Sequence, residues 1–235
     1  IEFTKDSVSN DTLRPIMNGI HFDFFEDRMV GVALSNSKFS KYTNLSVKQG
    51  DGNATGFTMP SKTARVLSKL ISKTEGNVKL SFNGRNVVVS RGDFRLTARL
   101  QEGKYPPYDQ LLRETKPIKV TVAREDVISA IKRVMPMGNT TSELVHFKFT
   151  EGLLTVSAED IDFSKSACVE IQCDHSGEDF EICLRGSSVS TLLSNVVDEN
   201  VVFNMSEYTK PAVIVPETCD GDVELTMLVM PMLLG

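Results

Sequence analysis

The strongest constraint on the fold is an internal repeat, because the chain matches itself at an offset of 125 residues. Residues 21–33 (HFDFFEDRMVGVA) align without a gap with residues 146–158 (HFKFTEGLLTVSA). Each segment alternates apolar and polar residues on both sides of an acidic or glycine-containing turn, which is typical of a β-hairpin. Two copies of one structural unit are therefore expected, rather than one larger domain.

A helix and a further strand pair follow the hairpin in both copies. Residues 61–73 correspond to residues 186–198, and both segments carry apolar residues at helical spacing, namely Val66, Leu67, Leu70 and Ile71 in the first and Leu192, Leu193, Val196 and Val197 in the second. Residues 77–100 then turn at Asn83-Gly84, a strong hairpin signal, and residues 200–217 parallel them. Strands outnumber helices, so the sequence predicts an α+β fold with antiparallel sheets.

The repeat also predicts the domain organisation. A chain of 235 residues has room for two ordinary domains, which we expect at residues 1–115 and 116–235, with the boundary near Glu114 to Pro117. A helix over residues 124–135 opens the second copy, whereas the first copy has only the segment KDSVSND at that place. Either the first copy has lost its opening helix, or residues upstream are missing from this sequence; we favour the second explanation.

Composition narrows the class of protein. Hydrophobic residues make up 40% of the chain and charged residues 24%, as in soluble globular proteins, and the apolar run over residues 225–234 is too short to span a membrane. No secretory leader opens the chain, so a cytoplasmic location is expected, with the four cysteines reduced. The net charge is −5, so a nucleic-acid partner would require basic residues concentrated on one face.

The helix predicted over residues 61–73 has such a face. Lys62, Arg65, Lys69 and Lys73 fall within about an 80° arc, because successive residues of a helix are 100° apart. No acidic residue of the helix interrupts this basic stripe, and its apolar residues cover the adjoining arc. The stripe is either a solvated surface or a surface that faces nucleic-acid phosphates.

Four segments together resemble one known family. In chain order they are LRPIMNGIHFDF (13–24), LQEGKYPPYDQLL (100–112), AEDIDFSKSA (158–167) and LVMPMLL (228–234). They are similar to the β sliding clamp of bacterial replication, and the resemblance covers nearly the whole chain. It implies two of the three clamp domains, the middle and C-terminal copies, with antiparallel sheets outside and helices lining a DNA channel. In that family two chains form a ring of six domains around duplex DNA, and the family has no cofactor.

The resemblance also implies site residues. The basic stripe would contact DNA phosphates without reading sequence, with Arg124, Lys132 and Arg133 as additions from the second copy. A groove between the two domains would bind apolar peptide motifs of the DNA polymerase, the clamp loader and repair factors, and it would use Met17, Leu34, Asn36, Lys38, Phe39, Pro106, Leu111, Met230, Pro231, Met232 and Leu233. The segment Met135, Pro136 and Met137 is either the homodimer interface or an ordinary helix-ending turn.

Two departures from the family pattern concern the groove. Residues 34–39 read LSNSKF where the family usually has Thr/Ser-Asp-Gly-His-Arg/Lys-Leu, and Leu233 stands where a basic residue is frequent. The wall of the groove should therefore have a different shape, and the choice of partners is open. A diverged clamp copy, or a peptide-binding adaptor that no longer closes a ring, is the alternative to a processivity clamp.

Signs of enzymatic chemistry are weak. Glu159, Asp160 and Asp162 are the only carboxylate cluster that resembles a Mg²⁺ site, but nothing at motif spacing completes it, and an exposed strand or turn is the simpler interpretation. His21 and His146 occupy equivalent positions in the repeat, which favours a structural role. No P-loop, GxSxG or HExxH motif occurs. The sequence predicts a binding protein without metal or catalytic residues, and a nuclease is a remote third hypothesis.

Overall fold

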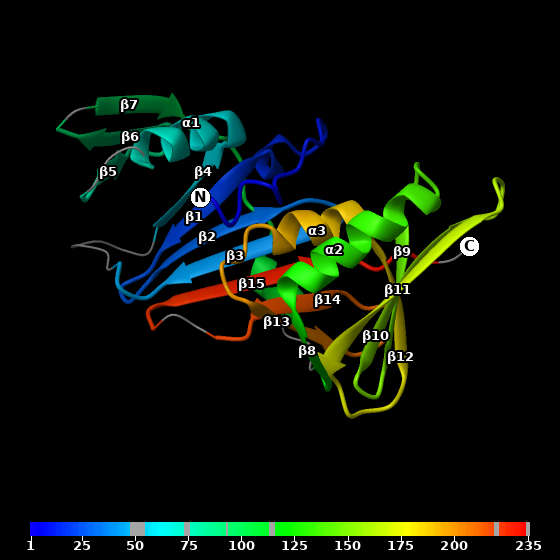
Figure 1. Cartoon of the computed structure of the whole chain (residues 1–235). Helices are drawn as coiled ribbons and strands as arrows, with labels where there is room; N and C mark the ends of the chain where they lie inside the picture. The colour runs from blue at the N-terminus through cyan, green and yellow to red at the C-terminus, as the bar shows by residue number, and fades with distance from the viewer. Residues whose placement is uncertain (48–54, 73–75, 93, 113–115, 219–220, 234–235) are drawn as a thin grey trace. The chain divides into compact units, whose positions relative to one another are not determined.

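The computed structural model describes residues 1–47, 55–72, 76–92, 94–112, 116–218 and 221–233. The chain divides into two compact units (Figure 1). Unit 1 comprises residues 1–108 and 220–225, and unit 2 comprises residues 109–219 and 226–235. Glu114, at the predicted domain boundary, lies outside the described residues. No helix among the described residues is long and apolar enough to cross a membrane.

Unit 1 contains two antiparallel sheets. The first has the strand order β4-β1-β2-β3, and the second has the order β5-β6-β7. Its elements are η1 (Pro15–Met17), β1 (Gly19–Phe24), β2 (Met29–Leu34), β3 (Lys38–Asn44), β4 (Thr55–Pro60), α1 (Ser61–Ile71), β5 (Lys79–Phe82), β6 (Asn86–Arg91) and β7 (Phe94–Arg99). The core is rich in aromatic rings, with Phe57 tilted against Phe22 and Phe82 at centroid distances of 5.4 and 4.7 Å.

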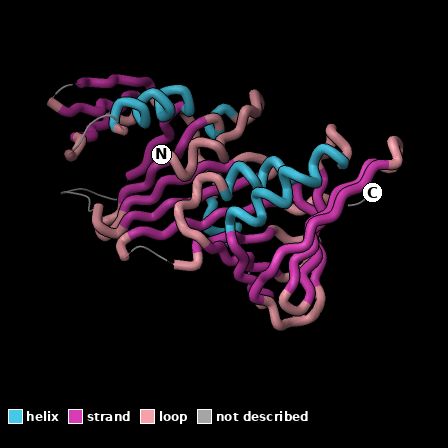
Figure 2. Tube along the Cα trace, in the orientation of Figure 1, coloured by secondary structure: helices cyan, strands magenta, loops and turns pink. Residues whose placement is uncertain are grey.

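Unit 2 repeats this arrangement with an additional helix, and in both units strands outnumber helices (Figure 2). The strand order is β12-β9-β10-β11-β8-β13-β14-β15, all antiparallel. The short helix η2 (Tyr108–Leu112) precedes these strands. The other elements are β8 (Ile118–Ala123), α2 (Arg124–Val134), η3 (Met135–Met137), β9 (Leu144–Thr150), β10 (Leu153–Asp160), β11 (Lys165–Asp174), β12 (Phe180–Arg185), α3 (Gly186–Leu193), β13 (Asn200–Met205), β14 (Ala212–Pro216) and β15 (Val223–Val229).

The strand registers reproduce the repeat. In unit 1 His21 pairs with Val32, and in unit 2 His146 pairs with Ser157, which are the same two positions shifted by 125. The pair Ile20 and Met59 recurs in the same way as Val145 and Leu184. The predicted α+β fold of two related antiparallel units is therefore confirmed at the level of individual backbone pairs.

The predicted helices differ at their ends. The helix expected over residues 186–198 ends at Leu193, because Ser194 Oγ donates to the Ser190 carbonyl at 2.7 Å and Asn195 Nδ2 donates to the Thr191 carbonyl at 3.3 Å. The Asn195 side chain gives the Thr191 carbonyl a partner at the helix end, and Ser194 bonds to the Ser190 carbonyl through its backbone N–H as well as through its hydroxyl. The spacing predicts that Val197 extends the apolar face, but this residue lies beyond the end of the helix and is 83% exposed. The first residues of unit 1 form turns where unit 2 has α2.

Candidate DNA-facing and peptide-binding surfaces

The basic stripe lies on the solvent side of α1. Ala64, Leu67 and Ser68 are buried, while Lys62, Arg65 and Lys69 are exposed. Lys73 lies outside the described residues. Val66, expected on the apolar face, is 45% exposed, because the buried arc is centred one third of a turn away, between Ala64 and Leu67. The exposed side of α1 thus places three cations next to one another, with Val66 among them.

An acidic residue from outside α1 meets this stripe. The Arg65 guanidinium donates to Asp6 Oδ1 and to the Lys5 carbonyl, both at 3.2 Å. Asp6 lies 59 residues earlier in the chain, so helical spacing could not reveal the pair. Lys62 and Lys69 are therefore the more available cations of α1, and Arg65 also attaches the first residues of unit 1 to the helix.

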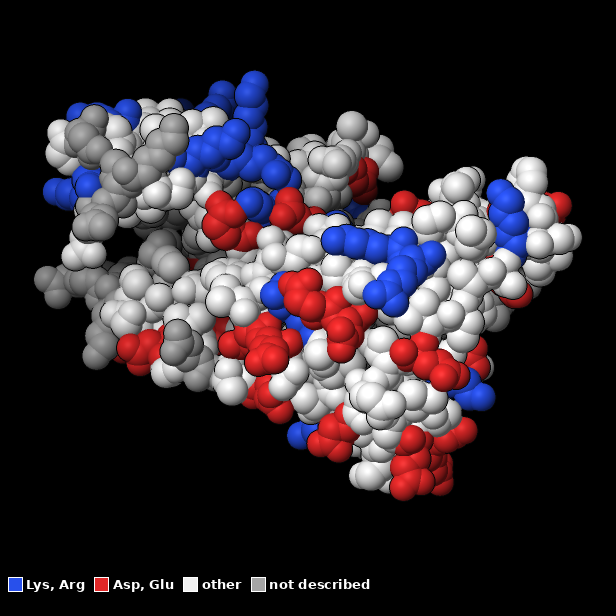
Figure 3. Space-filling model, viewed as in Figure 1, with Lys and Arg blue, Asp and Glu red and all other residues white. Residues whose placement is uncertain are grey.

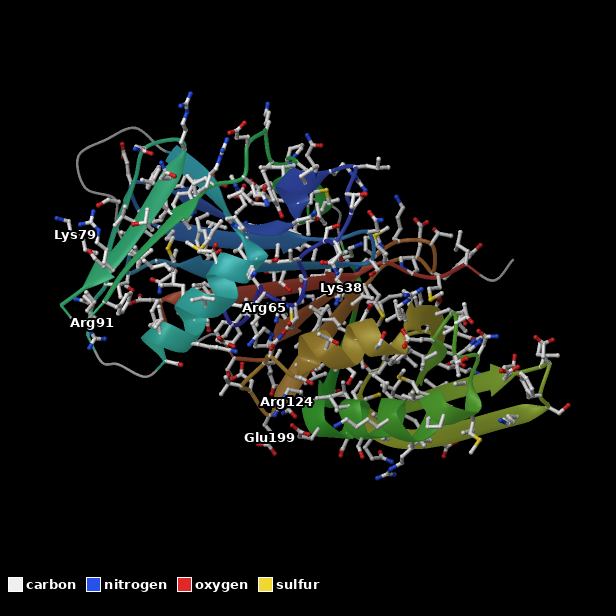
Figure 4. The ribbon with its side chains drawn as sticks, turned by 90° about the horizontal axis from the view of Figure 1, so that it is seen from above. Lys38, Arg65, Lys79, Arg91, Arg124 and Glu199 are labelled. Carbon is white, nitrogen blue, oxygen red and sulfur yellow. The ribbon has the colours of Figure 1, made fainter. Side chains whose placement is uncertain are left out.

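The three basic residues of α2 differ in availability. Lys132 and Arg133 are exposed near its C-terminal end. Arg124, at its start, has a side chain only 17% exposed, and it donates to the Asp198 carbonyl at 2.9 Å and pairs with Glu125 at 2.6 Å (Figure 4). Arg124 is thus occupied in joining α2 to the segment after α3, which weakens its candidacy as a phosphate contact. Helix α3 carries no basic residue.

The groove residues of unit 1 are unequally exposed. Met17 and Phe39 are 2% and 0% exposed, and Phe39 packs against the Tyr108 ring at a centroid distance of 6.5 Å. Both are core residues in this structure, which corrects their prediction as surface anchors. Asn36 is exposed and accepts a hydrogen bond from Arg14 at 2.7 Å. Leu34, Lys38 and Pro106 are half-buried, and burial lowers the pKa of Lys38, partly offset by the charge of Asp6.

The groove residues of unit 2 border a pocket. Met232 and Leu233 line a cavity of about 550 Å³ together with Asp179, Phe180, Glu181, Ile182, Cys183 and Tyr208. The C-terminal segment is held at this place by backbone contacts with β12, in which Met232 N–H donates to the Cys183 carbonyl at 2.8 Å and Pro231 forms a bridge with Leu184. Met230 and Leu111 are 39% and 36% exposed and do not line it.

Sequence reasoning missed β12 and Tyr208 as walls of this pocket. Tyr208 is 66% exposed, an unusual exposure for a large aromatic side chain, but no local pattern in the sequence signals it. The pocket depends on the pairing of the chain end with β12, which is a long-range contact. At the proposed dimer segment, η3, Pro136 is exposed and Met137 is 42% exposed, while Met135 is half-buried.

The acidic cluster has a structural role. Strand β10 ends at Asp160, and Asp162 lies in the following turn. Asp160 is 8% exposed and accepts from the Phe163 N–H at 3.4 Å, which closes that turn. Among the described residues no group of three His, Cys, Asp or Glu side chains could hold a metal ion.

The two equivalent histidines make different local contacts. His21 bonds to Thr58 at 2.9 Å and to Asp23 at 3.1 Å, and it stacks on Tyr105 at 4.5 Å. Burial raises the pKa of Asp23, but hydrogen bonds from His21 and Tyr108 outweigh it, so the pKa lies below its ordinary value. His146 lies 3.3 Å from Cys183 Sγ, and burial with the charge of Glu181 raises the pKa of that thiol, which opposes thiolate chemistry.

Comparison with known proteins identifies relatives of this chain. Residues 1–107 match the family model of the DNA polymerase III beta subunit, central domain. The beta sliding clamp of Synechocystis is 25% identical over 96% of this chain, and that of Treponema pallidum is 24% identical over 99%. The chain spans only 60% and 62% of the length of these two relatives.

Solved structures show the same fold. The DNA polymerase sliding clamp of Pseudomonas aeruginosa superposes on the whole chain with a TM-score of 0.93 at 21% sequence identity, and 63% of that clamp is covered. The beta subunit of Thermotoga maritima gives a TM-score of 0.89. Residues 1–107 therefore match the central domain of the DNA polymerase III beta subunit, and the chain over nearly its whole length is similar to bacterial β sliding clamps.

Proposed function

We propose that the intact protein is a DNA polymerase processivity factor that encircles duplex DNA. The observation that carries this proposal is the exposed row of Lys62, Arg65 and Lys69 on α1, within a fold shared with sliding clamps. Cations on a regular helix contact phosphates without reading bases, and such contacts allow a protein to slide. In this proposal α1 lines a channel and the sheets lie outside it.

The mechanism is topological and needs no catalytic residue. A ring that cannot leave the duplex keeps its bound polymerase near the primer end and so raises its effective concentration there. Closing the ring requires a homodimer with a further domain in each chain. We assign Met135, Pro136 and Met137 to that interface, since two of the three side chains are exposed apolar groups beside α2.

Ring closure is directly testable with the full-length protein. It should be a dimer by light scattering and should stay on nicked circular DNA through a high-salt wash, because a closed ring cannot slide off a circle. Linearising the same DNA should release it. A strictly monomeric full-length protein, or equal loss from circular and linear DNA, would contradict the clamp proposal.

We further propose that partners bind through the pocket beside the C-terminal segment. Met232 is half-buried and contributes a flexible apolar wall, which suits a site that accepts several related peptides. Tyr208 and Phe180 add aromatic surface, and Asp179 and Glu181 place negative charge at the rim. The pocket thus favours a short apolar motif, carried by a DNA polymerase, a clamp loader or a repair factor.

Truncating one wall of the pocket should weaken peptide binding. We expect Met232→Ala to raise the Kd of a fluorescent peptide with apolar anchors about tenfold, since loss of a central anchor contact costs about 1–2 kcal/mol. Fluorescence anisotropy measures the change. Met137→Ala is the matched control, because Met137 is 42% exposed but does not line the pocket. Equal effects of the two substitutions would argue against this site.

One observation favours the adaptor alternative. Phe39, in the segment that departs from the family pattern, is fully buried, and Leu233 presents an apolar side chain that is 65% exposed where a basic residue is frequent. A changed groove suits a restricted partner set. The circular-DNA experiment separates the two functions, because an adaptor that binds peptides without closing a ring would show no difference between circular and linear DNA.

A further inference from the structure

A second basic surface lies on the β5–β7 sheet of unit 1. Residues 76–99 contain five basic residues and one acidic residue, although the whole chain has a net charge of −5. The outer face of the three strands carries three cations and no described carboxylate. Its side chains are those of Lys79, Ser81, Asn86, Val88, Ser90, Arg95, Thr97 and Arg99. We call this the outer sheet face. In Figure 3 several separate basic side chains are visible on the upper part of unit 1, among side chains of other kinds.

The strand register places these cations together. Lys79 pairs with Ser90, which in turn pairs with Arg95, so the two charges flank a small serine in one row across the sheet. Arg99 lies two rows along β7, opposite Asn86, and pairs with exposed Glu102 at 2.6 Å. Lys79 and Arg95 have no carboxylate partner among the residues that the structure describes. Neighbouring rows of one sheet face are about 7 Å apart along a strand.

The outer sheet face is separate from the basic stripe of α1. Alternate residues of the same strands, Leu80, Val87, Val89 and Leu96, pack in the core with Ala64 and Leu67 of α1. The outer side chains must therefore point away from that core, since successive residues of a strand face opposite sides. Figure 4 shows Lys79 on the sheet, apart from Arg65 on α1.

The second copy of the repeat shows that the fold does not require this charge. The corresponding residues 200–229, which include β13, β14 and β15, contain one lysine and five acidic residues. The same architecture is therefore acidic in one unit and basic in the other. A basic face in an acidic protein is complementary to a polyanion, and its lack of exposed aromatic side chains excludes base stacking as the main contact.

We propose that the outer sheet face binds the phosphodiester backbone of DNA outside any ring, independently of base sequence. The cations of Lys79 and Arg95, with the smaller polar side chains between them, contact the backbone through charge and hydrogen bonds. This site goes beyond the encircling function, because it needs no closed ring and accepts DNA with free ends. It gives unit 1 cations on two surfaces, one on α1 and one on the sheet.

The test uses short linear DNA, which no ring retains. We expect Lys79→Glu/Arg95→Glu in the full-length protein to weaken binding about tenfold or more at low salt, and to reduce the slope of log affinity against log salt by about 2. Fluorescence anisotropy with single-stranded and duplex oligonucleotides measures both. A loss with both oligonucleotides, or with one of them, identifies which backbone form binds.

Matched controls make the result decisive. Lys119→Glu/Lys148→Glu reverses two exposed strand lysines of unit 2 and should leave the affinity unchanged. Thermal unfolding of all variants verifies the fold. Equal affinity of the outer-face variant and the wild type would overturn the proposal, and so would binding of polyglutamate in place of DNA, which would assign the face to an acidic protein. Retention on circular DNA tests the clamp function separately, and the outer-face variant should keep it.

Discussion

Phe203→Ala should lower the free energy of unfolding by about 3–5 kcal/mol, the usual cost of removing a buried phenylalanine. Phe203 is fully buried on β13, with ring centroids 6.5 Å from Phe147 and 6.0 Å from Phe149. Alanine would remove both aromatic contacts and leave a cavity between rigid strands, because Phe203 pairs through its backbone with Val120 and Ile214. The surrounding sheet therefore has little freedom to collapse around the gap.

Urea unfolding followed by circular dichroism measures this loss. Phe163→Ala is the matched control, since Phe163 lies in the turn after β10 and is 71% exposed. The Lys165 ammonium lies 5.4 Å from its ring centre, and the ring is otherwise largely exposed, so we expect a loss of less than about 1 kcal/mol. A loss at Phe203 as small as that at Phe163 would show that the aromatic cluster does not determine the stability of unit 2.

The fold was largely predictable because repetition carries information that single motifs lack. Two similar hairpins at the same place in the repeat predicted the α+β fold of two related units, and the strand registers of His21 and His146 follow the repeat. Helix ends were less predictable, as in α3, because Ser194 and Asn195 satisfy the last carbonyls through side-chain contacts that apolar spacing does not report.

The candidate sites were less predictable, because their availability depends on long-range contacts. Spacing placed Arg65 on a basic stripe, but its contact with Asp6 joins residues that are distant in the chain. Arg124 has the right charge on the right helix, yet it bonds to the carbonyl of Asp198. Phe39 matched a position in a family pattern, but its side chain is buried. The outer sheet face could not be predicted from spacing, because its cations belong to two strands, β5 and β7, and only the register of both with β6 brings them together.

Reversing the charges of the two available lysines of α1 should strongly weaken the binding of the full-length protein to DNA. We expect Lys62→Glu/Lys69→Glu to weaken binding about tenfold or more, because two phosphate contacts are lost and two repulsive charges are added. The slope of log affinity against log salt should fall by about 2. Arg65 is left intact, since its contacts with Asp6 and the Lys5 carbonyl hold the start of the chain.

The neutral variant Lys62→Gln/Lys69→Gln provides a graded comparison, and it should lie between the wild type and the reversed protein. Folding should survive both changes, because both side chains are exposed, although glutamate at position 69 in the last turn of α1 opposes the helix dipole by about 0.3–1 kcal/mol. Fluorescence anisotropy with a linear duplex oligonucleotide at increasing salt measures the effect. If all three proteins bind the duplex with the same affinity and the same salt slope, α1 does not face the duplex, and the stripe is a solvated surface of unit 1.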